Sequence, residues 1–273
     1  MRKLGYVEGS NVRYEIRNAD AISARLPQLA RELVAANVDL IVVPGSTEAV
    51  AAFRATASIP IVMIHTIDPV ELGLAVSLGK PGRNVTGLTA EGVGAKALDL
   101  LFEALPKVKR IAVLANTGAS RYPSVRKEME ELAASKHASL LATAEVKRPE
   151  DFDAAFARIS KDRPDAMVVF QDAIMFFNRR RIVAFAAQAR IPTMYGFTED
   201  VEAGGLMAFA TPYRVLYARA PEFVDKILKG AKPSELPIEQ PIQFGLWINM
   251  KTARALGLTF PPSIVARADR VIE

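Results

Sequence analysis

The sequence predicts an α/β fold in which two doubly wound parallel-sheet lobes are joined by three crossover segments. Short, continuous apolar runs alternate with segments whose apolar residues recur every three or four positions. This alternation is typical of parallel strands buried between two layers of helices. Turn-rich segments interrupt the alternation and indicate where the chain passes from one lobe to the other.

The expected strands are short runs rich in branched and aromatic apolar residues, of which LIVV, IAVL and MVVF are the clearest. In chain order they are 11–17, 39–43, 60–65, 110–115, 140–146, 165–170, 191–195, 205–210 and 242–248. Between them, apolar stripes at helical spacing predict helices that face a core, as in Leu26, Leu29 and Leu33.

Three segments are the expected crossovers: GKPGRN at 79–84, the acidic loop after 195–196, and the proline-rich stretch at 237–241. They divide the chain into a first lobe of 1–87 with 196–238 and a second lobe of 88–195 with 239–273. A ligand cleft is expected between the two lobes.

Composition excludes several classes of protein. No uncharged apolar run in the 273 residues approaches the roughly 18 needed to cross a bilayer, and no apolar segment typical of a signal peptide follows Met1. The net charge of +5 comes from 35 basic and 30 acidic residues that are interspersed, so no nucleic-acid partner is expected. The chain has no cysteine and two histidines far apart, so we expect no cofactor and no metal site.

The first lobe offers binding groups at the carboxyl ends of two strands, where ligands of open parallel sheets lie. Ser46 and Thr47 begin a helix and can present hydroxyls and backbone N–H groups to an anion, or Ser46 and Thr47 can act as plain helix caps. Asp68, after the next strand, can receive an ammonium group or cap a helix that begins at Pro69. Together these groups suit the two ends of a zwitterion.

The second lobe offers polar side chains in the corresponding loops. Asn116 and Thr117 follow one strand, Asp172 follows another, and Tyr195 ends a third. The neighbouring Phe176 and Phe177 can stack on an aryl ligand or pack within the lobe.

Four blocks of the sequence occur in the same order in one protein family. They are Asp68-Pro69-Val70 with LGKPGRNVTGLT, FFNRRRIVAFAAQARIPTMYG, VEAGGLMAFA through FVDKILKGAKPSELPIEQP, and PIQFGLWIN through MKTARALGLTFPPSIVARADRVIE. In this the chain resembles the tryptophan/tyrosine-type group of bacterial ABC-transporter substrate-binding proteins.

The resemblance implies the type I periplasmic-binding-protein fold and no catalysis. It implies a monomer, in the periplasm or anchored outside the cytoplasmic membrane, that closes around a small ligand and delivers it to an ABC permease. The implied ligand is an amino acid, aromatic or branched, or a related aryl carboxylate.

The start of the sequence differs from this family. Leu4-Gly5-Tyr6 is typical of a helix end, yet almost no helix precedes it. The family begins with a signal sequence, a first strand and most of a first helix. We therefore expect the first strand of lobe 1 to be missing and the chain to be truncated at its N-terminus.

Two other functions remain open from the sequence. The effector-binding domain of a transcription regulator shares the fold and predicts an upstream helix-turn-helix module. An enzyme such as a racemase, lyase or transferase would need paired acid and base groups, for example Asp68 facing Asp172 or His65.

Overall fold

The computed structural model describes residues 1–90, 94–240 and 245–273. The chain separates into two compact units. Unit 1 consists of Met1–Ala90 and Tyr213–Ile242, and unit 2 consists of Glu91–Pro212 and Gln243–Glu273. The chain therefore passes between the units three times.

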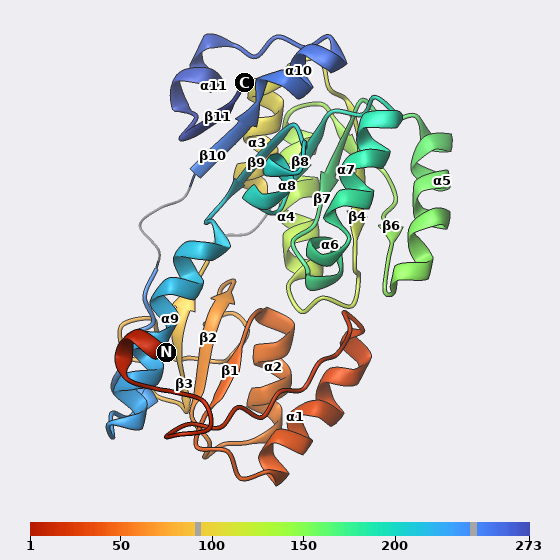
Figure 1. The fold of residues 1–273 in the computed structure, drawn as a ribbon. Helices are drawn as coiled ribbons and strands as arrows, with labels where there is room; N and C mark the ends of the chain where they lie inside the picture. The colour runs from red at the N-terminus through yellow and green to blue at the C-terminus, as the bar shows by residue number, and fades with distance from the viewer. Residues whose placement is uncertain (91–93, 241–244) are drawn as a thin grey trace. The chain divides into compact units, whose positions relative to one another are not determined.

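Unit 1 is built on a sheet of three parallel strands in the order β1 (Ile41–Val43), β2 (Ile61–Thr66) and β3 (Val85–Thr89). One face of this sheet carries α1 (Leu26–Ala35) and α2 (Ser46–Ala55), and the other carries α9 (Tyr213–Leu228) (Figure 1). The remaining elements are the short 3-10 helices η1 (Arg2–Leu4), η2 (Ser23–Arg25) and η4 (Pro233–Glu235).

Both faces of the unit 1 sheet are buried because successive strand side chains point to opposite sides. Ile61 and Met63 of β2 pack in the cluster that includes α2 residues, whereas Val62 and Ile64 pack in the cluster that includes α9 residues. Every residue of β2 is buried. This double coverage explains why the strand is a continuous apolar run in the sequence.

Unit 2 has a larger mixed sheet in the order β11-β10-β9-β8-β7-β4-β5, with β6 also paired to β4. All of its pairings are parallel except that of β9 with β10. Its strands are β4 (Arg110–Ala115), β5 (Ser139–Leu140), β6 (Ala144–Glu145), β7 (Ala166–Val169), β8 (Thr193–Tyr195), β9 (Met207–Ala210), β10 (Gly245–Asn249) and β11 (Arg270–Ile272). Its helices are α3 (Ala95–Ala104), α4 (Tyr122–Ser135), η3 (Pro149–Asp151), α5 (Phe152–Asp162), α6 (Ala173–Phe177), α7 (Arg179–Gln188), α8 (Thr198–Glu202), α10 (Met250–Leu256) and α11 (Pro262–Arg267).

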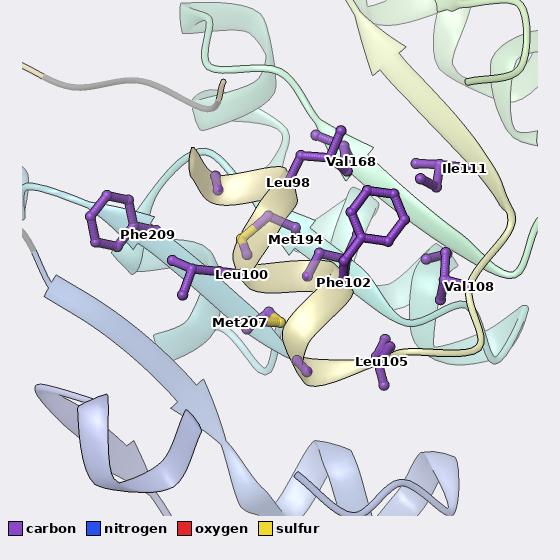
Figure 2. Packing of buried hydrophobic residues seen from close by; sticks show 14 of the residues in the cluster. Leu98, Leu100, Phe102, Leu105, Val108, Ile111, Val168, Met194, Met207 and Phe209 are labelled. Carbon is purple, nitrogen blue, oxygen red and sulfur yellow. The ribbon is translucent and has the colours of Figure 1, made fainter. Parts of the chain in front are cut away.

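The main core of unit 2 lies between its sheet and α3. Leu98 and Leu101 of α3 are fully buried and belong to one cluster with Val168, Met194 and Met207 of the strands. Figure 2 shows Leu98 of this helix among the strand residues of the cluster. The core fixes the strand order, and with it the loops that follow β4, β7 and β8.

One expected strand is wrong and one is divided. The segment 11–17 forms no strand: Val12 makes only an isolated bridge with Glu8, and Tyr14 and Ile16 are exposed. Its alternating pattern is compatible with a strand, but the segment has no ladder partner among the described residues. The segment 140–146 contains the end of β5 and the separate β6. At the start of the chain, η1 ends at Leu4 and is capped by Gly5, whose φ of 87° is left-handed, which confirms the expected helix end.

The expected lobe boundaries are wrong for residues 196–212, which lie in unit 2. The reason is that β9 pairs with β8 on one side and β10 on the other. Residues 88–90 and 239–240 lie in unit 1. Of the expected crossover at 237–241 and the expected strand at 242–248, residues 241–244 lie outside the described part of the chain. No helix of the described residues is long and apolar enough to span a bilayer.

Candidate functional site

The loops after β1 and β2 of unit 1 are joined at Ser46. Its hydroxyl oxygen accepts a hydrogen bond of 2.9 Å from the backbone N–H of Ile67. Ser46 also begins α2, so the carboxyl edge of the sheet and the start of a helix meet here. Thr47 follows on the same turn and is partly exposed. The structure thus places both hydroxyls at the edge where ligands of parallel sheets bind.

The start of α2 already carries a negative charge. Gly45 lacks a side chain, and Glu48 Oε2 lies 2.7 Å from the position that a Cβ atom on Gly45 would take. The carboxylate of Glu48 is therefore folded back over the helix start, where it complements the positive end of the helix dipole.

Asp68 serves a local role in the structure. It is exposed, adopts a φ of 47°, and its Oδ1 accepts a hydrogen bond of 3.1 Å from the N–H of Glu71. The residues after it form a turn and not the helix that Pro69 was expected to begin. Asp68 and Ser46 lie on adjoining loops because Ile67, the residue before Asp68, is the one bonded to Ser46.

The end of β2 turns the side chain of His65 toward α9. The pairing of β2 with β3 shifts register between Met63 and Thr66, which is typical of a β-bulge. The His65 ring is 3% exposed and contacts the Tyr213 ring edge-on, with 4.9 Å between centroids. Burial lowers the pKa of His65 to about 4, so the imidazole is neutral at neutral pH.

Two tyrosines begin α9 beside this edge. Tyr213 and Tyr217 lie one turn apart with ring centroids separated by 5.7 Å, and Tyr217 is 45% exposed. Burial and, second, the negative charge of Glu48 raise the pKa of Tyr217, which places the phenol near that carboxylate. The adjoining Thr66 hydroxyl is buried and makes no hydrogen bond to any described residue. Tyr213, Tyr217 and Glu48 were not among the candidates chosen from the sequence.

In unit 2 the structure brings Asn116 and Asp172 together at the carboxyl ends of the neighbouring strands β4 and β7. The Asn116 Nδ2 donates to Asp172 Oδ2 at 3.4 Å, while Asn116 Oδ1 accepts from the Gly118 N–H at 3.0 Å. Asp172 Oδ1 caps α6 by accepting from the Ile174 N–H at 3.0 Å. Burial raises the pKa of Asp172, and these hydrogen bonds oppose the shift. Thr117, next to Asn116, is partly exposed.

An aromatic cluster adjoins this pair on α6. Phe176 contacts Phe177 and Phe197 edge-on, at 5.8 Å and 5.1 Å between centroids, and the Arg179 guanidinium lies 4.7 Å from its ring centre. Phe177 is 71% exposed. Both alternatives from the sequence therefore apply in part: Phe176 packs within the unit, and Phe177 presents an open aromatic surface.

Tyr195 lies in the interior of unit 2. It is 1% exposed, and its ring carbon Cε2 lies 2.6 Å from the position that a Cβ on Gly205 would take. Burial raises the pKa of its phenol and also raises that of the nearby Asp200, to about 8. This placement gives Tyr195 a packing role in the strand β8 that carries the following loop.

No group of three or more metal-binding side chains occurs in residues 1–90, 94–240 and 245–273. The tyrosine pair could have been found from the sequence, because two tyrosines four positions apart follow directly after the expected strand at 205–210. Glu48 was hidden by its position at the start of a helix, where a carboxylate is common for structural reasons.

Known proteins with similar sequences and folds bind small ligands. A family model described as ABC transporter substrate binding protein matches residues 1–272. The tyrosine-binding protein of Clostridioides difficile is 27% identical over 254 residues, which are 93% of this chain and 73% of that protein.

Two solved structures are similar to this one throughout. A conserved domain protein from Vibrio cholerae has a TM-score of 0.88 and 30% identity, with 99% of this chain and 90% of that chain covered. The domain from Streptococcus pneumoniae in complex with L-Trp has a TM-score of 0.87 and 25% identity, with 99% and 91% covered. These matches agree with the architecture of both units.

Proposed function

The chain belongs to the family of ABC transporter substrate-binding proteins, and we propose that it is the extracytoplasmic receptor of an importer. In this proposal the protein binds an aromatic amino acid or a related aryl carboxylate and delivers it to a membrane permease. The family match over residues 1–272 is the observation that carries the proposal. The similarity to a tyrosine-binding relative and to a domain solved with L-Trp supports the ligand class.

The polar loops of both units supply the proposed contacts. Asn116, Thr117 and Asp172 of unit 2 present an amide, a hydroxyl and a carboxyl at the ends of two adjacent strands. Ser46 and Thr47 of unit 1 present hydroxyls at the end of another. Convergent polar groups of this kind fix the orientation of a polar ligand. Asp68 and Tyr195 have lower priority because one is committed to a turn and the other is buried.

Binding would select a closed conformation in which both units contact the ligand. Three chain connections between the units allow a hinge rotation that leaves each sheet intact. The ligand shifts the population only by its differential affinity for the closed form, so no chemical step is required. A dissociation constant near 1 μM, which corresponds to about −8 kcal/mol, allows both capture and release.

A thermal-shift screen followed by calorimetry tests this function. We expect one or more of L-tryptophan, L-tyrosine and aryl carboxylates to raise the unfolding temperature, because a ligand that binds only the folded state stabilises it. Asp172→Asn should weaken binding of the hit while keeping the α6 cap, since the asparagine oxygen still accepts from Ile174. The matched control is Asp162→Asn at the end of α5, where the carboxylate pairs with Arg158.

Absence of any stabilising amino acid or aryl acid would contradict the proposed ligand class. Equal effects of Asp172→Asn and Asp162→Asn on affinity would remove Asp172 from the site. Conversion of the hit to a product would contradict the receptor role, because a receptor returns its ligand unchanged.

A further inference from the structure

The start of α7 carries three consecutive arginines, and each has a different environment. The guanidinium of Arg181 is turned toward α5, where it pairs with Asp153. Arg180 is exposed. Arg179 is partly exposed, and its guanidinium lies over the Phe176 ring of α6, 4.7 Å from the ring centre. The proposed function leaves Arg179 without a role.

The guanidinium of Arg179 is held in place and keeps hydrogen-bond donors for another group. Its Nη1 donates to the Phe176 carbonyl oxygen at 2.9 Å, at the end of α6. Its Nε and Nη2 make no hydrogen bond to any residue of the described ranges. Asp200 interacts electrostatically with Arg179, but burial raises the pKa of the Asp200 carboxyl to about 8, so most of it is protonated at neutral pH. Arg179 is therefore a cation whose planar set of N–H donors suits a carboxylate.

Two phenylalanine rings of α6 adjoin this guanidinium. The Phe177 ring contacts the Phe176 ring edge-on, at 5.8 Å between centroids, and Phe176 in turn contacts Phe197 at 5.1 Å. Phe197 is buried, whereas Phe177 is 71% exposed. The contacts fix the position of Phe176 and leave Phe177 open to water. A flat apolar molecule that covers Phe177 therefore removes apolar surface from water.

These groups are connected to the loops that follow β7 and β8. The Phe176 N–H donates to the carbonyl oxygen of Asp172 at 3.0 Å, so α6 begins at this candidate binding residue. Phe197 lies two residues after the end of β8. A Cβ atom on Gly196 would lie 2.9 Å from Gln171 Cβ, which shows that the two loops are in contact. The guanidinium and the rings thus lie at the carboxyl edge of the unit 2 sheet, beside the candidate polar residues.

We propose that Arg179 binds the carboxylate of the ligand and that the exposed ring of Phe177, supported by Phe176, holds its aryl ring. This inference rests on the proposed function and makes the ligand class narrower. The subsite requires an aryl ring and a free carboxylate in one molecule. It therefore accepts aromatic amino acids and aryl carboxylates and disfavours aromatic amines that lack a carboxylate.

The test uses three indole probes that differ in their charged groups: L-tryptophan, indole-3-propionate, which lacks the ammonium group, and tryptamine, which lacks the carboxylate. The corresponding phenol compounds, L-tyrosine, 4-hydroxyphenylpropionate and tyramine, provide a smaller ring. Calorimetry on the full chain compares the wild type with Arg179→Gln and Arg179→Lys, and the unfolding temperature without ligand verifies that each variant folds. Arg180→Gln is the matched control, because it removes the same charge from the next residue of the same helix at an exposed position.

We expect the wild type to bind the amino acids and the propionates more tightly than the amines. Arg179→Gln should weaken these carboxylates by about tenfold or more, because hydrogen bonds between charged groups are roughly twice as strong as neutral ones. It should leave the affinity for the amines unchanged. Arg179→Lys should lose less than Arg179→Gln, because lysine keeps the charge but not the planar set of donors. Arg180→Gln should change none of the affinities.

A second set of variants tests the aromatic part of the subsite. Phe177→Leu should weaken all of the probes by about two- to tenfold, because leucine has no flat ring on which an aryl group can stack. Phe177→Tyr should keep the wild-type affinities. Tyr14→Leu, which removes an exposed aromatic ring from unit 1, is the control. Wild-type affinities in Phe177→Leu would remove Phe177 from the subsite.

Three results would overturn the role of Arg179. Wild-type affinity of Arg179→Gln for the carboxylates would remove Arg179 from the subsite and leave the receptor function standing. Equal losses in Arg179→Gln and Arg180→Gln would show a general effect of charge. Equal losses of amines and carboxylates in Arg179→Gln would show that Arg179 only supports the local structure. A wild type that binds none of the six probes would contradict the proposed ligand class and the subsite together.

Discussion

Arg219 and Glu239 form a bidentate ion pair within unit 1. Arg219 Nε and Nη2 donate to the two carboxylate oxygens of Glu239 at 2.8 Å and 2.7 Å. The backbone of Glu239 is also bound, since its N–H donates to Gly87 O at 2.9 Å and its carbonyl accepts from Thr89 N–H at 3.0 Å. The pair therefore connects α9 to the segment that follows η4 and holds that segment along β3.

Arg219→Lys should loosen this segment because lysine cannot make the two parallel hydrogen bonds. Both side chains are 37% exposed, so the loss of stability should be about 1 kcal/mol or less. Hydrogen exchange of residues 236–240 should become faster while that of β2 stays unchanged. Glu222→Gln is the control, because it removes the other carboxylate that contacts Arg219. Unchanged exchange at 236–240 would show that backbone pairing alone holds the segment.

The same pair has a defined pH dependence. The hydrogen bonds from Arg219 lower the pKa of Glu239 below its ordinary 4.5. A lowered carboxyl pKa contributes stability that is present above the unfolded-state pKa and is lost as the pH falls through the folded-state pKa. The difference in exchange between the wild type and Glu239→Gln should therefore be present at pH 7 and shrink below about pH 4.

Gly87→Ala should destabilise unit 1 strongly. Gly87 has a φ of 123°, and a Cβ atom there would lie 2.2 Å from the carbonyl oxygen of Met63. Backbone strain and a backbone clash add, so we expect a loss of roughly 2 kcal/mol or more. Gly230→Ala separates the two effects, because its φ is 97° but no atom lies within 4 Å of the added methyl group. Equal losses in the two variants would contradict the role of the close strand approach.

The sequence was sufficient to predict the strands whose two faces are both buried. Strands β4 and β7 contain the continuous apolar runs that predicted them, because their side chains are buried on both faces, except Arg110 at the start of β4. Which strands pair with one another cannot be predicted from such short segments of the sequence. The segment 11–17 has the alternation of a strand but, among the described residues, no partner beyond one bridge. Strand β9 joins unit 2 by pairing with β10, which is distant in the sequence.

The candidate binding residues were predicted from their positions in the loops that follow strands. The hydrogen bonds that their side chains make could not be predicted from the sequence. Asn116 and Asp172 were both chosen for their place after a strand, and their hydrogen bond depends on β4 and β7 being neighbours. Asp68 could cap or bind, and only the backbone shows that it caps a turn. Tyr213 and Tyr217 have the spacing of an ordinary helix face, so their place beside β2 required the fold.

Asp200→Asn should stabilise unit 2 at and above neutral pH. Burial raises the pKa of Asp200 to about 8, well above its ordinary 3.8. Between these values the folded state binds a proton that the unfolded state has released, so stability falls as the pH rises, by at most about 1.4 kcal/mol per pH unit. Asparagine removes this slope and can still accept the hydrogen bond from the Phe197 N–H.

Fluorescence measures this effect selectively. Trp247 is the only tryptophan of the chain and is buried in β10 of unit 2, so its emission reports the unfolding of that unit. In denaturant unfolding, the free energy of unfolding should fall less between pH 5 and pH 8 in Asp200→Asn than in the wild type. Asp162→Asn should keep the wild-type slope. A wild-type slope in Asp200→Asn would show that the buried carboxyl is ionised without cost.

His65→Phe should remove an opposite pH dependence from unit 1. Burial lowers the pKa of His65 from 6.5 to about 4, so between these values the unfolded state binds a proton that the folded state lacks. The wild type therefore loses stability as the pH falls below about 6.5, by at most about 1.4 kcal/mol per pH unit. Phenylalanine keeps an aromatic contact with Tyr213 and does not titrate, so hydrogen exchange of β2 should accelerate less between pH 7 and pH 5 after correction for intrinsic rates. The exposed His137 provides the control as His137→Gln, and an unchanged acceleration in His65→Phe would assign the acid sensitivity of unit 1 to other groups.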